Sequence, residues 1–378
     1  MGFFLVALTI FGSAYAFVGL KLAGPHGPLG MGVVWSILLF HFAATFVSFA
    51  LLRQVGPNPS TTPLFWFVYV GMGLFSFVFT GLLLGELGLL TLGVVGEVDE
   101  SRRAFLRSAL NWSVLAAAGL AGAWGIREAR RRPTVVEVDV PIEGLAADLE
   151  GFRIAQISDL HVGPTIGADF ARTVVETVNS LKPDMVALTG DLVDGSVEHL
   201  SDGIAPLGDL EAREGVYFVT GNHEYYSGVR SWCEKMAALG ATVLLNAHHL
   251  IERGNGRLLV AGVTDHRAGR MIPSHASDPD AAMAGAPEHD VRILLAHQPN
   301  SCRKAEPHGF DLQLSGHTHG GQMFPWNLVV RFAHAFDKGL HRFGRGWVYV
   351  NTGTGYWGPP MRVGVQSEIT LLRLVRAV

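Results

Sequence analysis

The sequence is poor in cysteine and in net charge, and both shortages exclude classes of protein. Cys233 and Cys302 are the only two cysteines in 378 residues, so we expect two unpaired structural thiols and no disulfide framework. A formal net charge of −4 gives no indication of nucleic-acid binding. Charge is scarcest in the first 130 residues, which are strongly apolar, whereas the remainder has the composition of an ordinary globular domain.

Four apolar stretches separated by Gly/Pro-rich breaks predict a membrane region at the start of the chain. They cover about 3–22, 31–52, 64–85 and 109–126, and a span takes roughly 20 residues. The first stretch has no basic segment ahead of it, so we expect a retained span and not a cleaved signal. We therefore expect a transmembrane region of about four helices at 1–126, a basic linker at 127–133 and a second domain at 134–378.

The orientation in the membrane depends on two opposing signals. Residues 101–107 (Ser-Arg-Arg-Ala-Phe-Leu-Arg) resemble a twin-arginine export signal at an internal position, with a basic helix flank as the alternative. Basic residues divide four against five between the two sides, which slightly favours a cytoplasmic second domain. We give the export-like pattern more weight. The expectation is a multi-pass protein of the bacterial plasma membrane with an extracytoplasmic second domain.

Alternating strand and helix patterns predict a layered α/β fold for residues 134–378. Apolar runs of strand length occur at 135–140, 152–157, 185–188, 216–219, 258–261, 291–295 and 347–350. The segments 168–181 and 228–239 carry an apolar face at helical spacing. Strands alternating with helices, together with several consecutive strands, indicate α/β or α+β layers.

Polar side chains follow these runs where each predicted strand ends. Two aspartates, one asparagine and four histidines make up the set: Asp159, His161, Asp191, Asn222, His297, His317 and His319. Each motif alone is a common turn, and a lone histidine is more often a core residue. Five motifs in order within one domain instead favour a shared site, because loops at strand ends are where a rigid sheet positions functional groups.

The mixture of ligand types predicts a pair of metal ions. Imidazole together with carboxylate suits zinc, iron or manganese. The absence of thiolates argues against a closed zinc site of the finger type, and seven groups are too many for one ion with an open position. Paired ions about 3.5–4 Å apart stabilise both the attacking and the leaving oxygen of a displacement at phosphorus. We therefore expect two divalent ions and a phosphoester substrate.

The motifs resemble those of the calcineurin-like metallophosphoesterase superfamily: Asp-x-His, Gly-Asp-x-x-Asp, Gly-Asn-His-Asp/Glu, a lone His and Gly-His-x-His, over about residues 150–375. The resemblance implies a four-layer αββα sandwich. It implies one ion held by Asp159, His161, Asp191 and His319, and a second by Asp191, Asn222, His297 and His317. It also implies that His223, oriented by Asp194, acts on the leaving-group oxygen or stabilises the transition state, while hydroxide held between the ions attacks phosphorus.

Local departures from the superfamily's motifs narrow the range of expected substrates. Its phosphoprotein phosphatases typically carry arginines at the positions of Gly195 and Thr220, which disfavours that activity here. Residues 316–322 (Gly-His-Thr-His-Gly-Gly-Gln) resemble a bacterial branch of membrane-associated phosphoesterases, some of which cleave a lipid-linked UDP pyrophosphate. The apolar segment 323–332 either contacts lipid or an acyl chain, or packs in the core. Arg362 either grips a substrate phosphate or is a surface residue without a role.

These patterns predict a membrane-anchored, dinuclear-metal phosphodiesterase or pyrophosphatase whose substrate could be lipid-linked. Two alternatives remain open at this stage. One is a phosphomonoesterase, distinguished by a preference for monoester substrates. The other is a membrane scaffold or transport protein whose second domain only binds metal or partners, and the intact ligand set beside His223 argues against it.

Overall fold

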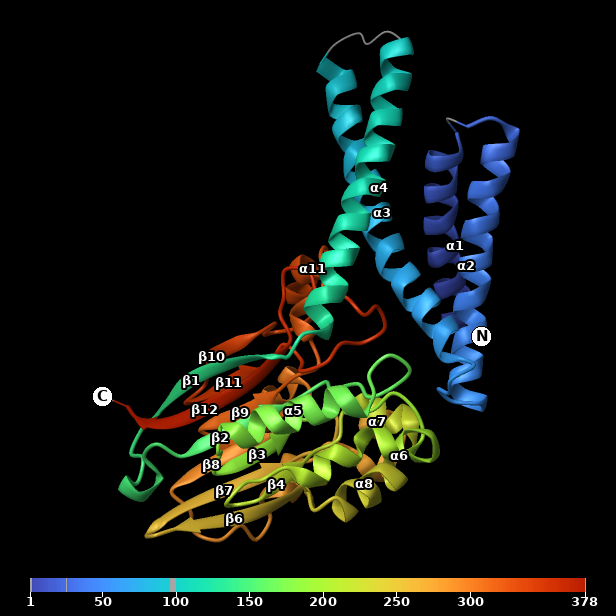
Figure 1. Cartoon of the computed structure of the whole chain (residues 1–378). Helices are drawn as coiled ribbons and strands as arrows, with labels where there is room; N and C mark the ends of the chain where they lie inside the picture. The colour runs from blue at the N-terminus through green and yellow to red at the C-terminus, as the bar shows by residue number, and fades with distance from the viewer. Residues whose placement is uncertain (1, 25, 96–99, 378) are drawn as a thin grey trace. The chain divides into compact units, whose positions relative to one another are not determined.

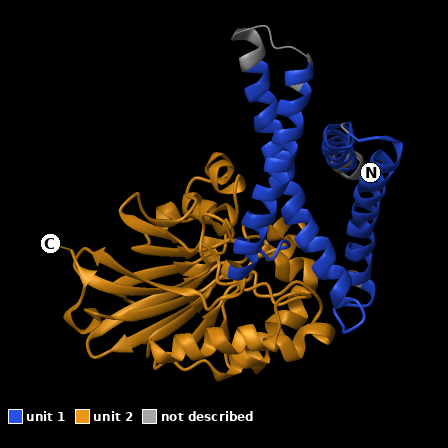
Figure 2. Ribbon diagram, turned by 45° about the horizontal axis from the view of Figure 1, so that its top comes forward, with its two compact units in different colours: residues 1–127, 358–361 blue, residues 128–357, 362–378 orange. Residues whose placement is uncertain are grey.

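In a computed structural model of the chain, residues 2–24, 26–95 and 100–377 are described. The chain divides into two compact units (Figure 2). Unit 1 contains residues 1–127 and 358–361, and unit 2 contains residues 128–357 and 362–378. The main boundary between the units therefore falls beside the expected basic linker at 127–133.

The described residues of unit 1 form four long helices (Figure 1): α1 Gly2–Ala23, α2 Pro28–Gln54, α3 Thr62–Val95 and α4 Glu100–Arg130. Each of the four expected spans lies within one of them. Among the described residues, three segments are long and apolar enough to cross a membrane: Pro28–Leu52, Thr62–Thr91 and Ala104–Arg130. The apolar segment of α1, Leu8–Ala23, is shorter, so the number of spans stays a prediction. The twin-arginine-like segment lies in the first turns of α4.

Polar groups inside these apolar helices bind neighbouring helices. The Tyr15 hydroxyl of α1 lies 2.6 Å from Nδ1 of His41 in α2, whose Nε2 lies 3.1 Å from the Val68 carbonyl oxygen of α3. Lys21 and Glu86 form an ion pair at 2.7 Å. A polar group in an apolar helix costs free energy unless it is paired. These contacts therefore fix neighbouring helices against one another.

Unit 2 contains two mixed six-stranded sheets. Sheet 1 has the order β1-β12-β2-β3-β4-β5, with the bounds Thr134–Ile142, Glu368–Arg376, Arg153–Ile157, Met185–Leu188, Val216–Phe218 and Thr242–Val243. Sheet 2 has the order β10-β11-β9-β8-β7-β6, with the bounds Gly339–Phe343, Gly346–Val350, Leu312–Ser315, Val291–Leu295, Gly256–Gly262 and Ala247–Arg253. Strands β2, β3, β4 and β5 are parallel, as are β7, β8, β9 and β11.

Helices α5, α6 and α8 cover the outer face of sheet 1, and α9 and α10 cover that of sheet 2. The bounds of the α-helices in unit 2 are α5 Ala168–Ser180, α6 Val197–Ile204, α7 Asn222–Ser227, α8 Val229–Ala238, α9 Pro279–Met283, α10 Cys302–Ala305 and α11 Trp326–Ala333. Short 3-10 helices join them: η1 Ala147–Leu149, η2 Ala205–Asp209, η3 Ala268–Arg270, η4 Pro273–His275, η5 Pro299–Ser301, η6 Glu306–His308 and η7 His319–Gly321. The expected helices at 168–181 and 228–239 correspond to α5 and α8.

The side-chain alternation of the strands produces the layers. In β2, Ile154 joins the core between the two sheets, whereas Ala155 and Ile157 join the core beneath α5, α6 and α8. A smaller cluster packs α9 and α10 against sheet 2, through residues such as Ala282 and Leu294. The order helix, sheet, sheet, helix confirms the expected four-layer αββα sandwich.

Candidate metal centre

The expected ligands all follow the carboxyl ends of parallel strands in unit 2. Asp159 and His161 follow β2, Asp191 follows β3, and Asn222 opens α7 after β4. His297 follows β8, while His317 and His319 follow β9. Because the parallel strands of each sheet end at the same edge, the loops after both sheets meet there. The structure therefore brings all seven expected residues to one edge of the sandwich.

The backbone at this edge is strained. Asp159, His161, Asp191, His317 and His319 all have φ between 51° and 70°, a region that residues other than glycine adopt only at a cost. Close approach also requires two glycines: a Cβ at Gly221 would lie 2.2 Å from Oδ1 of Asp191, and one at Gly316 would lie 1.9 Å from Oγ of Ser158. Strain at so many neighbouring positions is typical of a functional site.

One cluster of donor atoms contains Asp159, His161 and His319. The Nε2 atoms of His161 and His319 lie 3.1 Å apart, and Nε2 of His319 lies 3.3 Å from Oδ1 of Asp159. The Nδ1–H of His161 donates to Oδ1 of Asp194 at 3.0 Å, which leaves Nε2 free to bind a metal ion. All three side chains are buried.

A second cluster contains Asp191, His297 and His317. Nε2 of His297 lies 3.0 Å from Oδ2 of Asp191 and 3.2 Å from Nδ1 of His317. The Nδ1–H of His297 donates to the Thr189 carbonyl at 2.8 Å, so its Nε2 points toward the cluster. The two histidines of the Gly-His-Thr-His loop therefore belong to different clusters.

The donor set fits a pair of metal ions. Ligands about 2.1 Å from an ion lie roughly 3.0–3.4 Å from one another. The separations of 3.1 and 3.3 Å in the first cluster and of 3.0 and 3.2 Å in the second match this range, while Nε2 of His161 lies farther from Oδ1 of Asp159, at 3.9 Å. Oδ1 of Asn222 is buried without a hydrogen-bond partner among the described residues, and such an orphaned acceptor suits a cation. Asn222 was expected as a ligand of the second cluster, and its unpaired oxygen is consistent with that expectation.

Protonation states also fit metal binding. Burial lowers the pKa of His317 to about 3 and that of His319 to about 4, so both imidazoles are neutral near pH 7, as a metal ligand must be. Burial lowers the pKa of His297 as well, but the Asp191 carboxylate outweighs it and raises that pKa well above its usual value. A cation bound between Asp191 and His297 would replace this proton.

His223 lies beside the clusters and is held by Asp194. Its Nδ1–H donates to Oδ1 of Asp194 at 2.6 Å, and its backbone N–H donates to Oδ1 of Asp191 at 2.8 Å. Burial lowers the pKa of His223, but the carboxylates of Asp191 and Asp194 raise it to about 9. The imidazole therefore carries a proton on Nε2 at neutral pH, and it can donate that proton to a leaving group.

Glu224 is a supporting residue to which we assigned no role from the sequence. Its Oε1 accepts from the Leu192 N–H at 2.7 Å, and its Oε2 accepts from the N–H groups of Gly221 and Asp191 at 2.7 and 3.0 Å. One buried carboxylate thus fixes the loop after β3 against the loop after β4. The position of Glu224 in the Gly-Asn-His-Glu motif was the sequence feature that could have indicated this supporting role.

Arg362 does not occupy either of the positions expected for it. The side chain is fully buried, and its guanidinium donates to the carbonyl oxygens of Thr352, Gly353 and Gly355 at 2.7, 3.0 and 2.5 Å. It also lies 3.4 Å from Nδ1 of His319. Arg362 is therefore neither a surface residue nor open to a substrate phosphate. Its guanidinium instead packs against the loop that carries His319.

Aromatic residues flank His223 on the exposed side. The ring centroids of Tyr226 and Trp357 lie 5.4 and 5.6 Å from that of His223. The Gln322 amide binds the Trp357 backbone twice, accepting from its N–H at 2.9 Å and donating to its carbonyl at 3.0 Å. The Gly-Gly-Gln tail thus ties the metal loop to the segment that carries Trp357, a contact that sequence patterns do not reveal.

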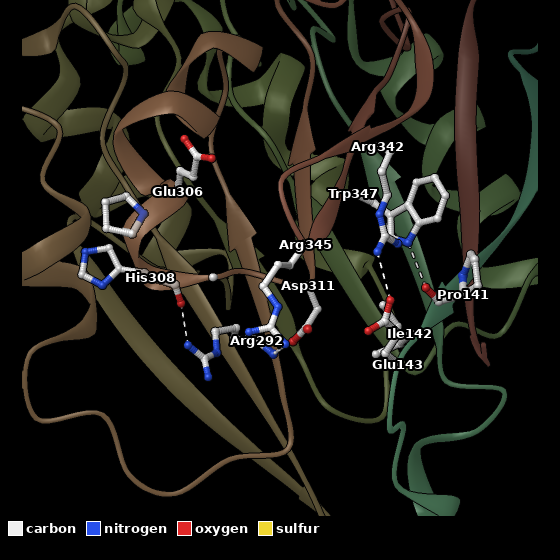
Figure 3. Close-up of a pocket in the computed structure, with 12 residues that line it drawn as sticks. Pro141, Ile142, Glu143, Arg292, Glu306, His308, Asp311, Arg342, Arg345 and Trp347 are labelled. Carbon is white, nitrogen blue, oxygen red and sulfur yellow. Dashed lines mark hydrogen bonds and ion pairs between the residues drawn. The ribbon is translucent and has the colours of Figure 1, made fainter. Parts of the chain in front are cut away.

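A separate cavity of about 430 Å³ lies at the opposite edge of sheet 2 (Figure 3). Its lining includes Arg292 and Asp311, at the amino ends of β8 and β9, and Arg342. Arg342 pairs with Glu143 at 3.0 Å, and Arg292 donates to the His308 carbonyl at 2.5 Å. Three arginines and three carboxylates lie in this lining, so their formal charges cancel.

Such a donor set, on this sandwich, defines the class of metal-dependent phosphoester hydrolases. The family model for calcineurin-like phosphoesterases matches residues 152–321. A zebrafish (Danio rerio) protein described as a transmembrane protein with metallophosphoesterase domain is 38% identical over 320 residues, which cover 82% of this chain and 72% of that protein. A Helicobacter pylori protein described as an uncharacterized metallophosphoesterase is 39% identical over 254 residues, 66% of each chain.

The chain belongs to the calcineurin-like metallophosphoesterase family. The resemblance inferred from the five motifs is thereby confirmed, and the protein is a phosphoester hydrolase. The likeness to the zebrafish protein extends beyond the catalytic domain. It agrees with the three helices that are long and apolar enough to cross a membrane.

Proposed function

We propose that this chain hydrolyses phosphodiester or pyrophosphate bonds with two divalent ions of manganese, iron or zinc. The proposal is supported by one observation, the juxtaposition of two donor clusters with the His223–Asp194 pair. Asp159, His161, Asp191 and His319 would hold one ion, and Asp191, Asn222, His297 and His317 the other. Bound there, the ions would neutralise charge on the phosphoryl oxygens and lower the pKa of a water molecule.

We assign the orientation of the two histidines to Asp194 and the transfer of the proton to His223. Asp194 receives the Nδ1–H groups of both His161 and His223, at 3.0 and 2.6 Å. It thereby directs one Nε2 toward the metal cluster and the other toward the leaving group. His223 delivers its Nε2 proton to the departing oxygen, which would otherwise leave as an alkoxide or a phosphate anion.

The surroundings favour a diester or pyrophosphate over a phosphoprotein. Thr220 is buried and Gly195 has no side chain, so neither position supplies a cation to a dianionic phosphate. A phosphomonoesterase would show the opposite substrate preference in the assay below. A scaffold that only binds metal would show no hydrolysis in that assay.

The membrane region leads us to propose a lipid-linked substrate and a place at the plasma membrane, with the catalytic domain outside the cytoplasm. The twin-arginine-like segment at 101–107 supports this side of the membrane. A reporter fused to the C-terminus, expressed in a bacterium with and without its twin-arginine pathway, tests the location. A cytoplasmic reporter in both strains would contradict it.

Hydrolysis of bis-p-nitrophenyl phosphate by the full chain in detergent tests the proposed chemistry. We expect turnover with Mn²⁺ or Zn²⁺, no turnover with excess chelator, and a preference for diester over p-nitrophenyl phosphate. His223→Gln is expected to lower kcat about 10²–10⁴-fold, because it removes the general acid. His308→Gln, whose ring lies outside both clusters, is the matched control. Full activity of His223→Gln, or activity that survives chelation, would contradict the proposal.

A further inference from the structure

Helix α11 (Trp326–Ala333) presents its apolar residues to the outside. None of its eight residues is buried. Leu328 and Val329 are each 47% exposed, and Phe332 is 84% exposed. A surface helix normally turns its apolar stripe toward the core. The core-packing alternative for segment 323–332 is therefore wrong for α11, and the side chains of Leu328, Val329 and Phe332 form an exposed apolar face.

The inward face of α11 is fixed to the metal loop. Its half-buried positions are Asn327, Val330 and the following His334, which are spaced three and four residues apart. A Cβ on Gly321 would lie 2.4 Å from the Asn327 nitrogen, so the start of α11 packs directly on η7. At the other end, the His334 ring centroid lies 5.2 Å from that of His317. The helix thus crosses the loop that carries both histidine ligands.

The exposed face continues ahead of the helix. Phe324 is 37% and Trp326 is 52% exposed. Together with Leu328, Val329 and Phe332 they form what we call the α11 surface. Tryptophan, phenylalanine and leucine beside a cation (here the exposed Arg331) are typical of helices that lie in the membrane interface. Arginine fits there because its stem lies along apolar groups while its charge stays in the headgroup layer.

We propose that the α11 surface inserts into the lipid bilayer that holds the membrane region of this same chain. The tether is short, because α4 ends at Arg130 and β1 begins at Thr134. The residues between them span only about 10 Å when extended. A domain held this closely to a bilayer meets lipid at a high effective concentration. The membrane region of the chain therefore keeps the α11 surface close to the lipid bilayer that we propose it contacts.

Insertion would place the metal loop at the level of the lipid headgroups. An interfacial helix buries its apolar face about 5–10 Å into the headgroup and acyl boundary, and α11 lies directly on η7. The substrate class that follows, which rests on the proposed hydrolytic function, is the phosphodiester or pyrophosphate of a membrane amphiphile. Such a substrate could be cleaved while its acyl chains remain in the bilayer.

Photocrosslinking of the full chain in nanodiscs of phosphatidylethanolamine and phosphatidylglycerol tests the insertion without reference to activity. Benzoylphenylalanine replaces Phe332, Phe40 of α2 as a positive control, or Asn255 in the β6–β7 turn as a negative control. We expect lipid adducts from positions 332 and 40 and none from 255. Adducts from position 40 alone, or a crosslink from 332 to a second copy of the chain, would overturn the proposal.

A matched pair of double variants tests the consequence for substrates. Val329→Glu/Phe332→Glu is expected to cleave bis-p-nitrophenyl phosphate within about twofold of the wild type. It should lose tenfold or more on an acyl-chain p-nitrophenyl phosphodiester carried in the nanodisc. Val329→Leu/Phe332→Leu should retain both activities. Equal activity of the glutamate variant on both substrates, or equal loss on both, would contradict the proposal. A wild type that forms the lipid adduct but cleaves neither substrate would refute the proposed hydrolysis and leave the insertion standing.

Discussion

Replacement of Asp191 by asparagine is expected to reduce hydrolysis of bis-p-nitrophenyl phosphate about 10³-fold or more. Asp191 is the carboxylate proposed to serve both ions, and metal ions supply several kcal/mol of transition-state stabilisation. Oδ2 of Asp191 lies 3.0 Å from Nε2 of His297, and its Oδ1 accepts from the His223 N–H at 2.8 Å. An amide keeps the size of the side chain but removes the negative charge that is proposed to hold the cations.

The fold of this variant is expected to persist. The Asp191 backbone N–H is bound by Glu224 at 3.0 Å, and that contact does not depend on the carboxylate. The measurement is kcat/KM of the full chain with saturating Mn²⁺, together with thermal unfolding. Asp202→Asn, which changes an exposed aspartate of α6, serves as the control and should match the wild type. A folded Asp191→Asn protein with undiminished kcat/KM would rule out the shared carboxylate.

Substitution of Arg362 by methionine is expected to destabilise unit 2 by about 3–5 kcal/mol, a typical cost of breaking a buried charged network. Burial lowers the pKa of Arg362 to about 10, so the guanidinium remains charged at neutral pH. Methionine fills similar space but leaves the carbonyl oxygens of Thr352, Gly353 and Gly355 without their donor.

The measurement is thermal unfolding of the full chain, with Arg373→Met as the control. Arg373 pairs with Asp139 at 2.7 Å on the surface, and such exposed pairs contribute little to stability because solvent screens them. We therefore expect a large loss of stability only in Arg362→Met. If that variant unfolded like the wild type but bound substrate more weakly, the result would contradict a structural role and support the phosphate-gripping role expected from the sequence.

The sequence predicted the layers and the ligand loops because both depend on local patterns. An apolar run of strand length marked β2, helical spacing marked α5 and α8, and the candidate metal ligands came directly after strand-length runs. The carboxyl ends of parallel strands share one edge of a sheet, so the candidate ligands that follow these strands lie close together in the fold. The assignment of His317 and His319 to different clusters, implied by the resemblance, agrees with their contacts to His297 and His161.

The features that escaped prediction depend on tertiary contacts. Strand β12 returns from the end of the chain to pair in parallel with β1, and no local pattern encodes that partner. Arg362 was judged by residue type alone, whereas its burial depends on the turn at 352–355 that surrounds it. Segment 323–332 is apolar whether it faces the core or a bilayer, so only the exposure of α11 in the fold excluded core packing for that helix.

The number of divalent ions bound by each chain tests the central claim most directly. Native mass spectrometry of the full chain, prepared with Mn²⁺ and released from detergent in the gas phase, counts the ions without an activity assay. We predict two ions per wild-type chain, and one or none in Asp191→Asn. A fully active wild-type chain that holds a single ion, or none, would contradict the dinuclear centre.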